Sequence, residues 1–309
     1  MGSTDGLRRR SVLGMLGAAG VLAAVPTAAP ALTAPVLKKP IPGTGEMLPA
    51  IGLGSWQTFN VGNDPEALDR CTEVIGRFFA LGGTVIDSSP MYGSSQPAIG
   101  QAVARLGKQR AVFSADKVWI SAGDEGAAQI EQSRRHWKVP YFHLVQVHNL
   151  LSWEDHLRTL QRMKHERKLR YVGITTSHGR RHDEFERVMR DHALDFIQIS
   201  YSPVDREVEQ RILPLAREKG IAVIVNRPFR QGALIERVKR HRLPPWASEI
   251  GCANWAQFLL KFVVSHPAVT VAIPATSRID HLEENMGAMR GVQPDEAARR
   301  RMAAHVEAL

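Results

Sequence analysis

Short apolar segments recur eight times along the chain, and the stretches between them place apolar residues at helical spacing. The segments are rich in valine and isoleucine and apolar at consecutive positions, which is typical of strands buried on both faces of a parallel sheet. The predicted strands are residues 51–54, 84–87, 111–117, 142–148, 171–175, 196–200, 222–226 and 269–273. Main helices are predicted at residues 65–81, 125–137, 153–168, 183–192, 206–219 and 248–264.

This alternation predicts an α/β fold of the (β/α)8 type, the TIM barrel. Two further helical stretches, residues 232–240 and 280–288, are expected as extra helices around the seventh and eighth units. A doubly wound open sheet is the alternative. That fold usually has a Gly-x-Gly-x-x-Gly turn after its first strand, whereas Gly54 is followed here by Ser-Trp-Gln.

Length and charge limit the classes of function. A chain of 309 residues with 44% hydrophobic and 23% charged residues is long enough for one barrel-sized domain and too apolar to be disordered. Its formal net charge is +9, of which residues 1–34 contribute +2. The basic remainder would attract anions such as a phosphorylated cofactor. Because the chain has no recognised nucleic-acid motif, we do not expect a nucleic-acid partner.

The N-terminal residues 1–34 are expected to be an export signal peptide, removed or disordered. Three arginines precede an apolar stretch at residues 13–25, which is too short to span a membrane and is followed by a small-residue cleavage zone around Ala29-Pro30-Ala31. Arg9-Arg10-Ser11-Val12-Leu13 resembles a twin-arginine signal, so we expect a periplasmic or exported protein that meets the twin-arginine machinery. An ordinary secretory signal or an uncleaved anchor is the alternative. Residues 35–47 then form a linker and N-terminal hairpin before the barrel at residues 48–309.

The two cysteines, Cys71 and Cys252, fall early in the first and last large predicted helices, which a closed barrel would make neighbours. Two buried free thiols are the favoured interpretation, and a disulfide formed after export is the alternative. No Cys-x-x-Cys pair occurs, and the one His-x-x-x-His spacing, His178 and His182, flanks a basic turn, so no metal site is expected.

Four residues with the side chains of a proton-transfer site follow successive strands. Asp87, Lys117 and His148 each end a predicted strand, and Tyr92 lies in the loop after Asp87. Carboxyl ends of barrel strands share one face, so these side chains should converge there. A phenol is a weak acid, and a nearby ammonium held by a carboxylate would lower its pKa. We therefore expect Tyr92 as general acid, Lys117 as its modulator, Asp87 as the anchor of Lys117, and His148 as the group that orients the substrate or helps relay the proton.

At residues 44–309 the sequence resembles the aldo-keto reductase family. The resemblance is carried by Leu-Pro-Ala-Ile-Gly-Leu-Gly-Ser-Trp at 48–56, Ile-Asp-Ser-Ser-Pro-Met-Tyr-Gly at 86–93, Asp-Lys-Val at 116–118, Val-Gln-Val-His at 145–148 and the segment at 273–285. It implies an oxidoreductase in which NAD(P)H lies across the barrel mouth and passes a hydride to an aldehyde or ketone. The partner would then be a small carbonyl compound. The sequence does not indicate an oligomeric state.

The resemblance also implies a set of cofactor contacts. Gln198 matches the residue that binds the nicotinamide amide, and Glu284 and Asn285 match residues that meet adenine. Arg278 is a partner for a 2′-phosphate, because a guanidinium binds phosphate in a bidentate manner. NADP(H) is therefore expected in preference to NAD(H). The other implied cofactor contacts are Thr176, Ser177, Asn226, Arg227, Phe229 and Thr276, while Trp56 and Trp119 follow strand ends and would line a substrate pocket.

Several positions depart from the family pattern. Asn226 stands where a tyrosine often stacks on the nicotinamide, Ala275 where many members have lysine, and His281 where many have a phosphate-binding arginine. Arg227 and Arg230 add cations near the expected pyrophosphate. A non-catalytic cofactor-sensing or partner-binding barrel is the alternative function, although such a protein does not need the complete set of four residues. A lyase or isomerase without nicotinamide is a further alternative, disfavoured by Gln198 and the segment at 273–285.

Overall fold

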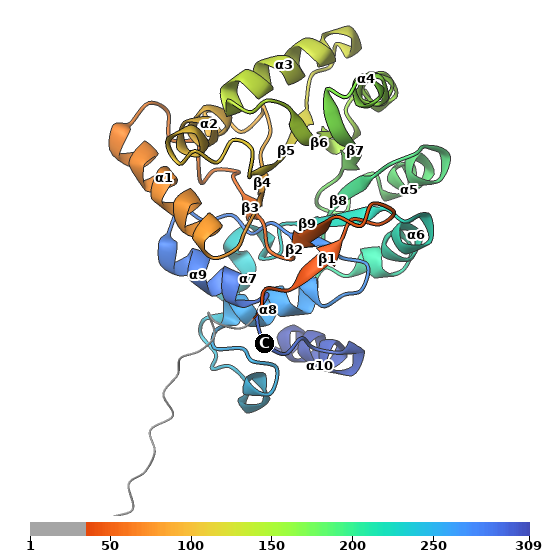
Figure 1. The fold of residues 1–309 in the computed structure, drawn as a ribbon. Coiled ribbons are helices and arrows are strands. Elements are labelled where there is room, and N and C mark those ends of the chain that lie inside the picture. The colour runs from red at the N-terminus through yellow and green to blue at the C-terminus, as the bar shows by residue number, and fades with distance from the viewer. Residues whose placement is uncertain (1–34) are drawn as a thin grey trace, which may run out of the picture. The chain divides into compact units, whose positions relative to one another are not determined.

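A computed structural model describes residues 35–309 of the protein. Its central element is a sheet of eight parallel strands that pair with one another in chain order. Figure 1 shows these strands surrounded by helices. The strands are β3 (Leu53–Gly54), β4 (Val85–Asp87), β5 (Phe113–Val118), β6 (Phe142–Val147), β7 (Leu169–Thr175), β8 (Phe196–Ser200), β9 (Ala222–Asn226) and β10 (Val271–Ala272).

The sheet closes into a barrel between its first and last strands. Parallel bridges join Ile51 to Ala272 and Gly54 to Ala275, and the Gly54 N–H donates to the Pro274 carbonyl at 3.1 Å. A Cβ atom on Gly54 would lie 2.7 Å from the Ile273 carbonyl oxygen, so the backbones can approach this closely only because residue 54 is glycine. The predicted (β/α)8 barrel is confirmed.

Helices follow the strands and cover the outside of the barrel. The first, α1, begins after Asp64, whose carboxylate accepts the N–H groups of Glu66 and Ala67, and it starts with Pro65. The ring is completed by seven further helices: α2 (Ser95–Arg105), α3 (Gly126–Trp137), α4 (Trp153–His165), α5 (His182–Asp191), α6 (Ile212–Lys219), α8 (Trp255–Val264) and α9 (Ile279–Gly287), in addition to α1 (Pro65–Ala80).

Within residues 35–309 two helices lie outside this ring, α7 (Ala233–Val238) after β9 and α10 (Glu296–Glu307) after α9. The expectation of two extra helices is thus met, but the stretch at residues 280–288 is not one of them. It forms α9, which contacts both α8 and α1, and Arg77 of α1 pairs with Glu283 of α9 at 2.6 Å. Figure 1 shows α9 between its two neighbours. The eighth strand therefore has its own ring helix.

Two apolar layers hold the barrel together. The outer layer lies between strands and helices. The inner layer fills the barrel with side chains such as Phe113, Leu144 and Phe196. Ile41 and Leu48 belong to this inner layer, and they come from the N-terminal hairpin of β1 (Lys38–Pro40) and β2 (Met47–Pro49). The hairpin therefore contributes to the barrel core.

Both cysteines are buried free thiols, as the favoured interpretation expected. The expected adjacency of their helices is wrong: Cys71 lies on α1 and Cys252 precedes α8, and α9 lies between these helices. Within residues 35–309 no helix is long and apolar enough to cross a membrane. The same part of the chain contains no group of three or more His, Cys, Asp or Glu residues that could hold a metal ion.

Candidate active site

The barrel mouth brings together the four residues that were expected to converge. Asp87 ends β4, Lys117 is the penultimate residue of β5, and His148 directly follows β6. Tyr92 lies in the turn after β4, where its N–H donates to the Ser89 carbonyl at 3.0 Å. Neighbouring parallel strands place these side chains at the same end of the barrel because the carboxyl ends of all eight strands open on one face.

Asp87 and Lys117 form a buried ion pair. The Lys117 Nζ lies 2.5 Å from the Asp87 Oδ2 and also donates to the Ser88 carbonyl at 2.8 Å. The two side chains are 0% and 3% exposed. Burial alone would lower the pKa of Lys117, but the charge and hydrogen bond of Asp87, together with the acidic groups of Tyr92 and Asp116, outweigh it and raise that pKa above its ordinary value. Lys117 is therefore a fixed positive charge.

Tyr92 lies against this charge. The Lys117 Nζ is 5.3 Å from the centre of the phenol ring. Burial raises the pKa of Tyr92, while the Lys117 charge and its hydrogen bond act in the opposite direction. The net shift is upward, whereas the sequence alone led us to expect a downward one, because the phenol is desolvated and the carboxylates of Asp87 and Asp116 also disfavour the phenolate. Tyr92 is consequently a neutral, protonated phenol at neutral pH.

His148 is a neutral imidazole at this site. Burial, together with the nearby Lys117 charge, lowers the pKa of His148 to about 2. Its ring meets the Tyr92 ring edge-on, with the ring centres 5.8 Å apart. A neutral imidazole can donate a hydrogen bond from one nitrogen, but it has no spare proton to give at neutral pH. Of the two expected roles, orientation of the substrate fits this state, and proton relay from an imidazolium does not.

A second buried carboxyl group lies beside the four residues, and the sequence analysis did not single it out. Asp116 is 1% exposed, and its oxygens accept hydrogen bonds from the Lys117 N–H at 2.7 Å and from the Gln96 Nε2 at 2.8 Å. Burial raises the pKa of Asp116 to about 7. Asp116 is adjacent to Lys117 in sequence, but only the tertiary structure shows that its carboxyl group is shielded from water.

Gln198 is tied to the ion pair. Its Nε2 donates to the Asp87 Oδ1 at 2.9 Å, and its Oε1 accepts from the Asn226 Nδ2 at 3.4 Å. Asn226 also donates to the Thr176 carbonyl at 3.1 Å and accepts from the Ser200 hydroxyl at 2.7 Å. The amides of Gln198 and Asn226 therefore link Asp87 to the ends of β7, β8 and β9.

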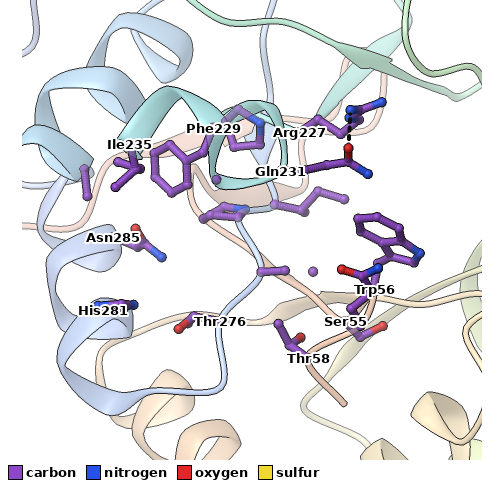
Figure 2. A pocket seen from close by; sticks show the side chains of 18 of the residues that line it. Ser55, Trp56, Thr58, Arg227, Phe229, Gln231, Ile235, Thr276, His281 and Asn285 are labelled. Atoms are coloured by element: carbon purple, nitrogen blue, oxygen red, sulfur yellow. Dashed lines mark hydrogen bonds between the residues drawn. The ribbon is translucent and has the colours of Figure 1, made fainter. Parts of the chain in front are cut away.

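A cavity of about 580 Å³ opens beside Asp87 and Tyr92, and we call it the mouth cavity. Figure 2 shows Arg227, Phe229, Gln231 and Ile235 along one wall, facing Ser55, Trp56, Thr58 and Thr276. The residues expected at the cofactor or substrate that do line it are Gln198, Arg227, Phe229, Thr276, Glu284, Asn285 and Trp56.

Five other expected contacts do not line the mouth cavity. Thr176 and Ser177 hydrogen-bond to the Arg180 carbonyl and to Asn149, and Asn226 is held in the network with Gln198. Arg278 forms a two-point ion pair with Asp280, in which the Arg278 Nε lies 3.0 Å from the Asp280 Oδ1. Trp119 is 40% exposed, and its backbone pairs with the Gln129 side chain.

Comparison with known proteins identifies the family. The model of the aldo/keto reductase family matches residues 50–305, which is most of the chain. The protein belongs to the aldo/keto reductase family.

Individual relatives of this aldo/keto reductase are distant. It is similar to the NADH-specific methylglyoxal reductase of Escherichia coli, with 26% identity over 67% of this chain and 72% of the relative. It is also similar to probable aldo-keto reductase 1 of Glycine max, with 24% identity over 77% of this chain and 80% of the relative. A crystal structure of an aldo-keto reductase from Klebsiella pneumoniae with NADPH shares the fold, with a TM-score of 0.71, 24% identity and coverage of 87% and 95%.

The donors of the mouth cavity suit a nicotinamide dinucleotide. Arg227 lines the cavity, and its Nη1 is buried without a hydrogen-bond partner among the described residues. This nitrogen can therefore donate a hydrogen bond to a phosphate oxygen. Its other terminal nitrogen donates to Gln231 at 2.7 Å. The amides of Gln198 and Asn285 also line the cavity and can bind polar groups of a base or a carboxamide. These residues fit the cofactor that the family uses.

Proposed function

We propose that this aldo/keto reductase reduces an aldehyde or ketone with a hydride from NAD(P)H, and that Tyr92 is the general acid. The observation that carries the proposal is the buried Asp87–Lys117 pair, 2.5 Å across, placed against the Tyr92 ring beside a cavity with cofactor-type donors. A reduced nicotinamide bound in that cavity supplies the hydride to the carbonyl carbon.

Each of the four residues has a separate role in this proposal. As the carbonyl carbon gains the hydride, the proton of the Tyr92 hydroxyl moves to the carbonyl oxygen and leaves a phenolate. The Lys117 ammonium stabilises that phenolate, and Asp87 holds the ammonium in place. His148, which is neutral, donates a hydrogen bond that orients the carbonyl.

The test is the loss of NADPH absorbance with a panel of small aldehydes, comparing the wild type with Tyr92→Phe. The phenylalanine keeps the ring and removes the proton, so we expect kcat to fall by a factor on the order of 10² to 10⁴, the usual contribution of a general acid. Cofactor binding, followed by fluorescence titration, should change little. Retained turnover in Tyr92→Phe would refute the role of Tyr92. A wild type that binds cofactor tightly but turns over no carbonyl would favour the sensing function instead.

For the cofactor we propose NADP(H) in preference to NAD(H), with Arg278 at the 2′-phosphate. Arg278 and its partner Asp280 are both exposed, and water screens an exposed ion pair, so a phosphate can replace the carboxylate at little cost. Replacing Arg278 by Ala should raise the KM for NADPH more than the KM for NADH. Equal weakening of both cofactors would contradict this assignment. Arg227 is the proposed pyrophosphate contact.

We also propose that the protein is exported by the twin-arginine route, although residues 1–34 lie outside the part of the chain that the structure describes. The support is the pair Arg9-Arg10 ahead of an apolar stretch and a small-residue cleavage zone. A reporter fused after residue 40 should reach the periplasm, and replacing both arginines by lysine should stop its export. Export that is unaffected by the replacement would favour an ordinary secretory signal. The barrel at residues 48–309 would then act outside the cytoplasm.

A further inference from the structure

A buried serine contacts the imidazole of His148. Ser89, two residues after Asp87, places its Oγ 2.9 Å from the His148 Nδ1. Ser89 is fully buried and His148 is 6% exposed, so water does not compete for this hydrogen bond. The turn that carries Ser89 is fixed by the Tyr92 N–H, which donates to the Ser89 carbonyl at 3.0 Å. The serine is therefore held in one place relative to both Tyr92 and His148.

The direction of this hydrogen bond follows from the other partner of the serine. The Met91 N–H donates to the Ser89 Oγ at 3.3 Å, so one acceptor site of the hydroxyl is already used. If His148 also donated to the Oγ, the hydroxyl hydrogen would have no acceptor among the described residues and would be buried unpaired, which is costly. If the hydroxyl donates to Nδ1 instead, every polar atom of the serine side chain is satisfied. Nδ1 is then the acceptor, and the imidazole hydrogen is on Nε2.

We propose that Ser89 is a positioning residue that fixes His148 as the Nε2–H tautomer, so that the site presents two donors, Tyr92 Oη–H and His148 Nε2–H, to one carbonyl oxygen. The inference rests on the proposed carbonyl reduction for its catalytic meaning. Because the ring is neutral, only one nitrogen carries hydrogen, and the wrong tautomer would point a lone pair at the substrate oxygen. A carbonyl oxygen has two lone pairs and can accept from both donors, which favours carbonyl substrates over acceptors with a single available lone pair.

The chain contains a matched pair that serves as a control. Ser114 is also fully buried, and its Oγ lies 3.3 Å from the Nδ1 of His143, but neither residue belongs to the candidate active site or lines the mouth cavity. Ser114→Ala removes the same chemical group from a serine–histidine contact that is only partly buried. It should leave both turnover and the state of His148 unchanged.

The experiment combines kinetics with nitrogen NMR of full-length protein labelled with ¹⁵N-histidine, comparing wild type, Ser89→Ala, Ser89→Cys and Ser114→Ala. The His148 signal is assigned by its loss in His148→Gln. In the wild type, we expect the shifts of a neutral ring with hydrogen on Nε2 between pH 5 and 9. In Ser89→Ala and Ser89→Cys, the tautomer should become mixed and kcat should fall by about tenfold or more, a size typical of lost orienting partners. Cysteine fills the space of serine but is a weak hydrogen-bond donor. If Ser89 acted only through packing, Ser89→Cys would therefore remain fully active.

The outcomes separate this inference from the proposed function. A wild-type ring with hydrogen on Nδ1 overturns the inference, and so does a single Nε2–H tautomer that persists in Ser89→Ala with unchanged kcat. Full activity of Ser89→Cys with a mixed tautomer also overturns it, because tautomer and rate would then be unrelated. Absence of carbonyl turnover in the wild type refutes the proposed function alone, since the NMR result still decides the tautomer. Thermal unfolding of each variant establishes that the fold is retained.

Discussion

Replacing Asp116 by Asn should make the protein more stable at alkaline pH and should remove part of its pH dependence. The carboxyl group is buried, accepts hydrogen bonds from the Lys117 N–H and Gln96, and has its pKa raised from 3.8 to about 7. Between these values the folded protein keeps a proton that the unfolded chain has released. Stability supplied by the neutral group is therefore fully present below about pH 4 and is lost as the pH rises to about 7.

The size of the effect follows from the two pKa values. Moving from 3.8 to about 7 corresponds to about 4 kcal/mol, at roughly 1.4 kcal/mol for each tenfold change in proton affinity. Asparagine resembles the protonated acid in shape and charge, so Asp116→Asn should escape this loss. The difference in unfolding free energy between the variant and the wild type should grow in favour of the variant from pH 4 to pH 7 and then level off.

The assay is denaturant unfolding of both proteins at intervals from pH 4 to pH 9, with Asp191→Asn as the control for loss of one negative charge at an exposed position at the end of α5. The test is how the difference in unfolding free energy between Asp116→Asn and wild type changes with pH. A difference that is the same at every pH reports only the packing or hydrogen bonding of the new amide. A difference that stays flat across the range would refute the argument that burial raises the pKa of Asp116. A difference that falls as the pH rises would mean that the fold lowers the pKa of Asp116 instead of raising it.

Two further predictions concern charges at the mouth and on α9. Lys117→Met should lower the unfolding free energy by about 3–5 kcal/mol, because it leaves the buried Asp87 carboxylate without its partner. Adding Asp87→Asn to this variant should recover part of the lost stability. If the two substitutions instead had additive effects on the unfolding free energy, Asp87 and Lys117 would not be a coupled pair. Asp280→Asn should lower the KM for NADPH relative to the KM for NADH, because it releases Arg278 from its ion pair and removes a negative charge. An unchanged ratio of the two KM values in steady-state kinetics would count against Arg278 as the 2′-phosphate contact.

The convergence of the four residues could be predicted from the sequence because it depends only on periodicity. Asp87, Lys117 and His148 each mark the end of a strand, and parallel strands of a barrel end on one face whatever the details of packing. The direction of the net pKa shift of Tyr92 could not be predicted in the same way. It depends on how far water is excluded and on the distances to several charges, which sequence spacing does not contain.

The residues around the four were harder to find for the same reason. Ser89 lies two residues after Asp87, and Asp116 directly precedes Lys117, but their partners, His148 and Gln96, come from elsewhere in the chain. Gln198 was expected at the cofactor, and the structure adds its hydrogen bond to Asp87, 111 positions away. Which polar groups meet in the mouth cavity is decided by strand register and side-chain direction.

By itself the sequence determined that this chain alternates strands and helices, closes as a barrel and carries an acid, a phenol, an ammonium and an imidazole at one face. Only the tertiary structure decided where individual helices pack. α2 contains Gly100, which disfavours a helix interior, yet this glycine lets α2 approach α3 so closely that a Cβ would lie 1.9 Å from the His136 carbonyl. Local patterns encode which face of an element is apolar, whereas such contacts depend on distances between segments that are remote in sequence.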